Sequence, residues 1–166
     1  DPRGALAFDG VDDFVEVSHR PSLNAYPLTL AAWIRTSRNG AFVDGVASKY
    51  VDGSFNGYGL FVYFGRIRAF YFGPPGSSVW GGGQGLDGGP VADGEWHHVT
   101  FVVDAAGGRL RVDGRPAASL PWVGPPGPPS TTAGPVADTL TPMLMSASAA
   151  VAPNRDRAIT SGLMDD

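Results

Sequence analysis

Short apolar runs separated by glycine- and proline-containing turns make up most of this sequence. The chain has 24 glycines and 15 prolines among its 166 residues, and no segment longer than about two turns has helical spacing. The apolar runs contain Val, Phe, Tyr and Trp, which are typical of β-strands. A chain of many short strands covers its apolar faces by stacking two sheets or by closing a barrel. Because the connections are uneven and long, we expect an all-β sandwich.

Composition and charge exclude several other classes of protein. Hydrophobic residues make up 43% of the chain, which is too apolar for a disordered segment and gives one domain, residues 1–166, a substantial core. A net charge of −4 without a basic cluster argues against a nucleic-acid partner. The lack of cysteine excludes disulfides and thiol catalysis. The longest uncharged stretch, residues 116–137, contains seven prolines, so we expect no membrane insertion.

The clearest predicted hairpin covers residues 58–72. A two-residue turn at Gly65-Arg66 would place Phe64 opposite Ile67. Both faces of this hairpin are apolar, so we expect the second face to be covered by another segment or kept open for a ligand. That second face carries four side chains: Phe61, Tyr63, Arg68 and Phe70. Tyr63 and Arg68 would be directly opposite, close enough for a cation–π pair.

A second hairpin is predicted over residues 99–113, with Leu110 and Val112 facing the core and a further turn at Asp113-Gly114. Short strands are expected at residues 5–8 and 13–17, and a longer one at residues 28–35. Two long segments, 73–94 and 121–135, have no clear periodicity. They are longer than ordinary connections, and long irregular loops often carry function.

Four segments resemble one known family in order and spacing. They are residues 5–15, 30–34, 94–99 and 110–114, the third reading Gly-Glu-Trp-His-His-Val and the last Leu-Arg-Val-Asp-Gly. Together they resemble the laminin-G-like domains of the concanavalin A-like lectin/glucanase superfamily. The resemblance implies an antiparallel jelly-roll β-sandwich. It also implies a noncatalytic, lectin-like module of a secreted, extracellular protein that binds a polysaccharide or cell-surface glycan.

Two departures from the family pattern concern the ends of the chain. The family's last strand continues beyond the segment matched by residues 162–165, whereas this chain stops at Asp166. Most of a strand that usually precedes Ala5 is also missing, and the chain starts at Asp1 instead of Met. We therefore expect a fragment of a larger secreted protein with its last strand cut short.

An acidic cluster near the N-terminus is a candidate calcium site. Calcium is held by six to eight oxygen ligands on a flexible loop, and the turn at residues 9–13 offers the carboxylates of Asp9, Asp12 and Asp13. The family resemblance adds Asp165 from the last strand. Such an ion would be structural and would tie the termini together. The alternative interpretation is an ordinary turn followed by a solvent-exposed strand.

Catalysis is not expected. A retaining glycoside hydrolase needs two carboxylates roughly 5 Å apart, but the only glutamates are Glu16 and Glu95, and the superfamily's glucanase motif is absent. A hydrolase is therefore the third-ranked function. His97 and His98 are adjacent, so on a strand they face opposite sides and form no zinc site. We expect His98 to be a partly buried residue that is hydrogen-bonded near the core.

Aromatic side chains are the best indication of ligand binding, because flat rings stack on the apolar faces of sugars while polar groups bond the hydroxyls. Trp33 and Trp96 lie on predicted strands, at positions that the family resemblance implies belong to the core, so we interpret them as packing residues. The predicted ligand-binding residues lie in the irregular loops and on the second hairpin face: Trp80, Trp122, Phe61, Tyr63, Arg68 and Phe70. Alternatively, loop 73–94 folds over that face and Trp80 plugs it. A protein-interaction or adhesion domain that uses the same loops is the second-ranked function.

Overall fold

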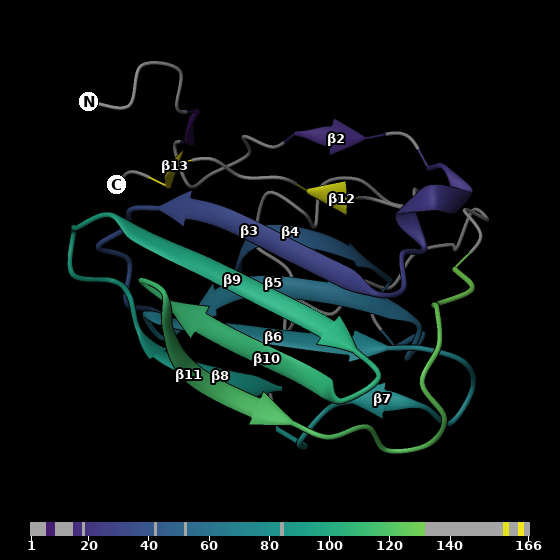
Figure 1. Cartoon of the computed structure of the whole chain (residues 1–166). Helices are drawn as coiled ribbons and strands as arrows, with labels where there is room; N and C mark the ends of the chain where they lie inside the picture. Colours follow the sequence, from purple (N-terminus) through teal and green to yellow (C-terminus); the bar gives the residue numbers. More distant parts are fainter. Residues whose placement is uncertain are drawn as a thin grey trace.

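The computed structural model describes residues 6–8, 15–17, 19–41, 43–51, 53–83, 85–131, 158–159 and 163–164. Two antiparallel sheets lie face to face, as Figure 1 shows. The expected antiparallel sandwich is therefore confirmed. One sheet has the strand order β11-β10-β9-β3, and the other has the order β4-β5-β6-β7 with β8 also paired to β6. The elements of these sheets are β3 (Leu28–Ile34), β4 (Val43–Tyr50), β5 (Gly57–Tyr63), β6 (Arg66–Phe72), β7 (Ser78–Val79), β8 (Leu86–Pro90), β9 (His97–Asp104), β10 (Gly107–Val112) and β11 (Arg115–Leu120).

The remaining elements are short. They are β1 (Ala7–Phe8), which pairs in parallel with β13 (Leu163–Met164), β2 (Glu16–Val17), which pairs with β12 (Ala158–Ile159), and the 3-10 turn η1 (Pro21–Leu23). Within the part of the chain that the structure describes, no helix has the length and apolar character needed to cross a membrane.

The β5–β6 hairpin turns one residue earlier than predicted. Phe64 and Gly65 form the turn, with φ values of 49° and 65°, so Val62 lies opposite Ile67. A tight turn with positive φ at both central residues is one of the two-residue turns that match the twist of the flanking strands. The predicted register was therefore wrong. Moving the turn by one residue shifts the pairing by two, however, so each strand residue stays on its predicted face.

The core lies between the two sheets and follows the alternation of the strands. Val99, Phe101 and Val103 of β9 are fully buried, as is Leu110 of β10. Val112 is half-buried and packs against this core, so the predicted inward positions of Leu110 and Val112 are confirmed. Tyr71 of β6 is also buried, and its hydroxyl donates to the carbonyl of Ala25 at 2.8 Å. Burial raises the pKa of the Tyr71 phenol, so it remains a neutral donor that holds residues 21–27 against the core.

The segment 73–94, predicted as an irregular loop, contains β7 and β8, and both pair with β6. Two further strands were not predicted. β4 contains Gly45 and has a bulge there, and β11 is composed largely of Pro, Ala and Ser. The segment 121–131 is irregular, as expected, except for a bridge between Val123 and Ser78.

Candidate functional site

The outer face of the β11-β10-β9-β3 sheet carries an exposed indole. In β3 the side chains of Leu28 and Ile34 point into the core, so Trp33 points outward, and it is 59% exposed. The prediction that Trp33 packs in the core was therefore wrong. The reason is the parity of the strand, because Trp33 lies next to the fully buried Ile34 and adjacent strand residues face opposite sides.

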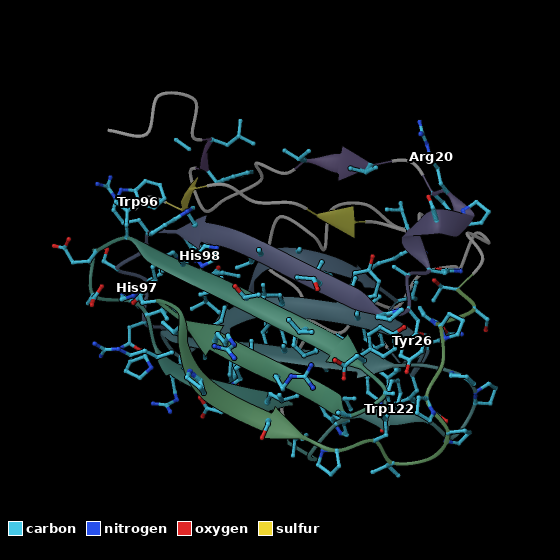
Figure 2. The ribbon with its side chains drawn as sticks, in the orientation of Figure 1. Arg20, Tyr26, Trp96, His97, His98 and Trp122 are labelled. Carbon is cyan, nitrogen blue, oxygen red and sulfur yellow. The ribbon has the colours of Figure 1, made fainter. Side chains whose placement is uncertain are left out.

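Three further side chains lie with Trp33 at this end of the sheet. Trp33 pairs with His98 of β9 in the register, and their ring centroids are 5.1 Å apart. Just beyond the paired residues, the guanidinium of Arg35 lies over the half-buried Trp96 ring, 5.7 Å from its centroid. We call Trp33, Arg35, Trp96 and His98 the Trp33 patch. Figure 2 shows Trp96 and His98 at the same end of β9.

The prediction placed His98 near the core, whereas the structure places its side chain on the outer face. It is partly buried because its ring packs against Trp33. The next row of outward residues continues the surface away from the patch. It consists of Ala31, Thr100 and Arg111, which are paired across β3, β9 and β10. Ala31 and Arg111 are exposed, and Thr100 is half-buried. The surface next to the Trp33 patch therefore combines small side chains with polar groups.

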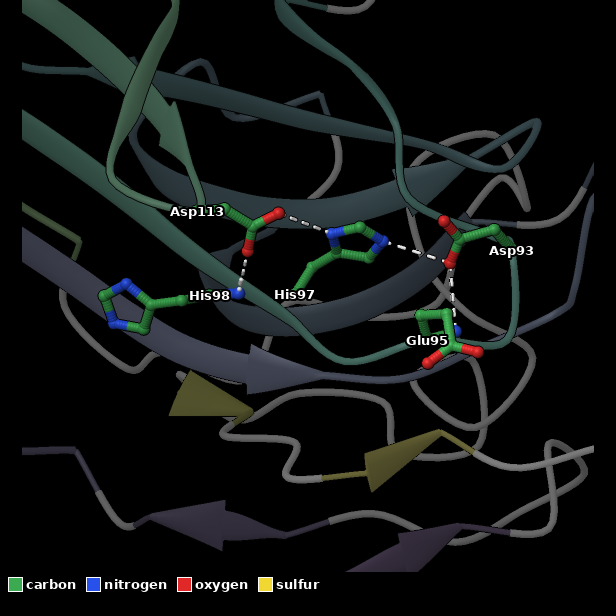
Figure 3. Close-up of polar contacts among 5 residues, drawn as sticks. All are labelled: Asp93, Glu95, His97, His98 and Asp113. Atoms are coloured by element: carbon green, nitrogen blue, oxygen red, sulfur yellow. Dashed lines mark hydrogen bonds and ion pairs between the residues drawn. The ribbon is translucent and has the colours of Figure 1, made fainter.

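A carboxylate–imidazole–carboxylate cluster lies at the same end of β9 (Figure 3). His97 Nδ1 is 2.8 Å from Asp113 Oδ2, and His97 Nε2 is 3.0 Å from Asp93 Oδ1. Asp113 Oδ1 also accepts a hydrogen bond from the His98 main-chain N–H at 2.9 Å. Asp93 Oδ1 similarly accepts from the main-chain N–H of Glu95. The imidazole of His97 is therefore clamped between two carboxylates that are themselves bonded to the backbone.

The charges of this cluster stabilise one another. Burial lowers the pKa of His97, but the hydrogen bonds to Asp113 and Asp93 outweigh it, so the pKa of His97 is raised above its ordinary value. The hydrogen bond to His97 is the main reason that the pKa of Asp113 is lowered. The pKa of Asp93 is lowered by its hydrogen bonds to Glu95 and His97. The arrangement therefore favours an imidazolium between two carboxylates.

Two of the residues predicted to bind a ligand are buried. Phe61 is 3% exposed and Phe70 is 1% exposed, so neither ring presents a stacking surface. Trp80 packs against Phe70 and Phe72, with ring centroids 5.8 and 5.5 Å apart. The alternative interpretation, in which Trp80 plugs the second face of the hairpin, agrees with this packing. The periodicity could not show it, because a covered apolar face and an open one have the same alternation.

Arg68 and Tyr63 do not form the predicted pair. The observed register places Tyr63 opposite Arg66, and the Tyr63 ring contacts Phe64 at a centroid distance of 4.5 Å. The guanidinium of Arg68 is instead 3.2 Å from Asp87 Oδ2. Arg66 bonds the same carboxylate.

Trp122 is half-buried and fixed in place by the fold. Its Nε1 donates to the carbonyl of Asp104 at 2.7 Å, and its ring lies edge-on to Tyr26 and Tyr71. Figure 2 shows Trp122 beside Tyr26 at the opposite end of the sandwich from Trp96. This packing indicates a structural role for Trp122 rather than the predicted contact with a ligand.

The predicted calcium ligands Asp9, Asp12, Asp13 and Asp165 lie outside the described residues, so this site stays a prediction. Within the described ranges, no group of three or more His, Asp or Glu side chains is arranged to hold a metal ion.

Comparison with known families identifies the fold. A family model described as the concanavalin A-like lectin/glucanases superfamily matches residues 9–139. The chain belongs to this superfamily. Among the solved structures, the LG4-5 domains of the mouse laminin alpha1 chain match with 15% sequence identity and a TM-score of 0.53. The alignment covers 90% of this chain and 38% of that one, so the chain spans well under half of the laminin structure. No curated protein matches the sequence.

Membership in the concanavalin A-like superfamily supports a lectin-like or adhesion domain with a laminin G-like fold. The description of the superfamily names both lectins and glucanases, so the choice between binding and catalysis depends on the site itself.

Proposed function

We propose that this chain is a noncatalytic carbohydrate-binding module of an extracellular protein, and that it binds glycans on the outer face of the β11-β10-β9-β3 sheet. The observation that carries the proposal is the 59% exposure of Trp33 near the end of β3, the edge strand of this sheet. The indole packs against the ring of His98, and its exposed part offers a flat apolar surface to a ligand.

The surroundings of Trp33 suit a sugar ring. The indole offers a flat apolar surface for the C–H face of a pyranose, and the small Ala31 leaves space beside it. His98, Thr100 and Arg111 lie on the same face and offer hydrogen-bonding groups to hydroxyls. Arg111 Nη1 donates to the carbonyl of Gly114 at 3.1 Å, which orients the guanidinium along the turn that follows β10.

The carboxylates near the Trp33 patch support binding over catalysis. Asp93 and Glu95 flank Gly94, which has a φ of 82° at a bend. The Asp93 carboxylate is already bonded to the Glu95 N–H and to His97. A general acid needs a raised pKa, whereas the pKa of Asp93 is lowered. Asp93 is therefore poorly suited to act as the general acid of glycoside hydrolysis.

The proposal predicts a large loss of binding when Trp33 is replaced by alanine. We expect Trp33→Ala to weaken glycan affinity roughly tenfold or more, because the stacking surface is lost. The free energy of unfolding should change by less than about 1 kcal/mol, since the side chain is exposed. Binding would be measured on an immobilised glycan array and then by calorimetry with the glycans that the wild-type chain retains. Phe55→Ala is the matched control, because Phe55 is 65% exposed but lies in the β4–β5 connection.

A protein-interaction domain is the second candidate, and two exposed rings favour it. Phe55 and Phe64 are 65% and 49% exposed, and both have a φ of 49° in connections at opposite ends of β5. Large residues rarely adopt this conformation, and strained residues cluster at binding sites. If the wild-type chain retains no glycan on the array, the carbohydrate proposal is wrong and these rings become the first residues to test.

A further inference from the structure

We propose that Asp113 is the positioning residue of the Trp33 patch, and that glycan binding at the patch weakens when His97 loses its proton. The part of this inference that concerns glycan binding rests on the proposed function. The part that concerns the coupling between His97, Asp113 and Trp33 can be tested without any glycan.

The first step is the main-chain link between Asp113 and His98. The Asp113 N–H donates to the His98 carbonyl at 2.8 Å, and the His98 N–H donates to Asp113 Oδ1 at 2.9 Å. Asp113 therefore bonds both the N–H and the carbonyl of the His98 main chain. The two residues lie one position beyond Val99 and Val112, the last pair of β9 and β10. The His98 ring then projects onto the outer face and packs against Trp33.

The second step is the link from Asp113 to His97 on the other side of the strand. Oδ2 of Asp113 bonds His97 Nδ1, while Oδ1 bonds the His98 main chain. One carboxylate therefore connects the side chain of His97 to the backbone that carries His98. Figure 3 shows the two rings on opposite sides of Asp113. We therefore expect a change in the His97–Asp113 contact to reach the backbone at the base of the Trp33 patch.

The third step is the proton. An imidazole donates from both ring nitrogens only when it is protonated, and both nitrogens of His97 face carboxylate oxygens. A neutral His97 would direct a lone pair at Asp113 or at Asp93, and that carboxylate would have to move away. The charged groups that face His97 are Asp93, from the bend before β9, and Asp113, from the β10–β11 turn. His98 also interacts electrostatically with Asp113.

The direction of the pH dependence follows from these charges. Because the pKa of His97 is raised in the folded chain, its stabilising contribution is complete below the ordinary histidine pKa, about 6.5. That contribution is lost as the pH rises through the raised value. The pKa values of Asp93 and Asp113 are lowered, so their contribution is lost only in acid. Between the lowered pKa values of the two aspartates and the raised pKa of His97, all three groups are charged and their hydrogen bonds are formed. Glycan binding should therefore decline when the pH rises above the pKa of His97.

The experiment follows Trp33 and glycan binding across pH in parallel. The indole N–H resonance of Trp33, assigned with Trp33→Phe, is recorded by NMR without glycan from about pH 5.5 to pH 9. The glycan array is read at both ends of this range. In the wild-type chain we expect the Trp33 resonance to titrate together with His97, and array binding to fall roughly fivefold at high pH.

Asp113→Asn tests the role of the carboxylate. The asparagine oxygen can still accept the His98 N–H, and its amide can donate to Nδ1 of a neutral His97. The clamp then no longer needs the proton, so both pH profiles should become flat. His97→Gln removes the titrating group and should also flatten them if Asp113→Asn does not fold. Asp104→Asn is the control, because Asp104 pairs with Arg109 elsewhere on the sheet and should leave the wild-type profile unchanged.

The possible outcomes separate the two proposals. A Trp33 resonance that titrates with His97 in the wild-type chain but not in Asp113→Asn supports the positioning role, even if no glycan binds and the proposed function fails. A Trp33 resonance that is insensitive to the state of His97 overturns the positioning role, even if the array retains the chain. Glycan binding that is equally strong at both ends of the pH range overturns the predicted weakening.

Discussion

Replacing Phe101 by alanine is expected to lower the free energy of unfolding by about 3–5 kcal/mol, which is the usual cost of removing a buried phenylalanine. Phe101 lies in the middle of β9 and is fully buried. It pairs with Leu30 on one side and Leu110 on the other, so its ring fills the space between the two sheets. The backbone of β9 is hydrogen-bonded to β10 on one side and to β3 on the other, so the cavity can close only in part.

The matched control is Val102→Ala on the neighbouring residue of the same strand. Val102 pairs with Thr29 and Arg109 on the outer face and is half-buried. We expect this substitution to cost less than about 1.5 kcal/mol, because less apolar surface leaves a packed environment. Urea denaturation of both variants measures the difference. Equal losses in the two variants would contradict the assignment of the inner and outer faces of β9, on which the position of the Trp33 patch depends.

The sequence predicted the fold because alternation survives in the strands that form its centre. In β9 and β10, Phe101 and Leu110 alternate with polar or smaller residues, and one tight turn joins the two strands. The β5–β6 hairpin shows how far such reasoning extends. Its turn position was wrong, but the faces were right, because the error shifted the pairing by an even number of residues.

The candidate site was harder to predict, for two physical reasons. β3 reads Leu-Thr-Leu-Ala-Ala-Trp-Ile, which is apolar on both faces near its end, so nothing in the composition shows that Trp33 faces solvent. Phe61 and Phe70 are the reverse case, because they were predicted to contact a ligand but are buried. They occupy a second apolar face that is buried, and whether such a face is covered depends on contacts from distant segments, which periodicity does not report.

The His97 clamp depends on the exact register of the second hairpin, which the sequence did not give. The hairpin predicted over residues 99–113 had its loop at residues 104–108, and this would place Val99 opposite Asp113. The observed turn at residues 105–106 pairs Val99 with Val112 instead, and this places Asp113 beside His98. The position of Asp93 could not be obtained from a strand register, because its carboxylate reaches His97 through the bend around Gly94, and bends have no register.

Replacing Gly107 by alanine should destabilise the sandwich by at least about 3 kcal/mol, through backbone strain and a clash together. Gly107 has a φ of 117°, and a Cβ added to it would lie 2.1 Å from the carbonyl oxygen of Leu120. That oxygen belongs to the last residue of β11. Relieving the clash would therefore push β10 and β11 apart at the start of β10, next to the β9–β10 turn.

Gly114→Ala isolates the contribution of strain alone. Gly114 also has a positive φ, 75°, but nothing lies within 4 Å of an added Cβ, so we expect a loss of about 1 kcal/mol. Thermal and urea denaturation of the two variants give the comparison. A loss in Gly107→Ala no greater than in Gly114→Ala would contradict the close approach of β11 to this position. A larger loss in Gly107→Ala would reflect both the close approach of the neighbouring strand and the φ of 117°, which lies further from the left-handed region than the 75° of Gly114.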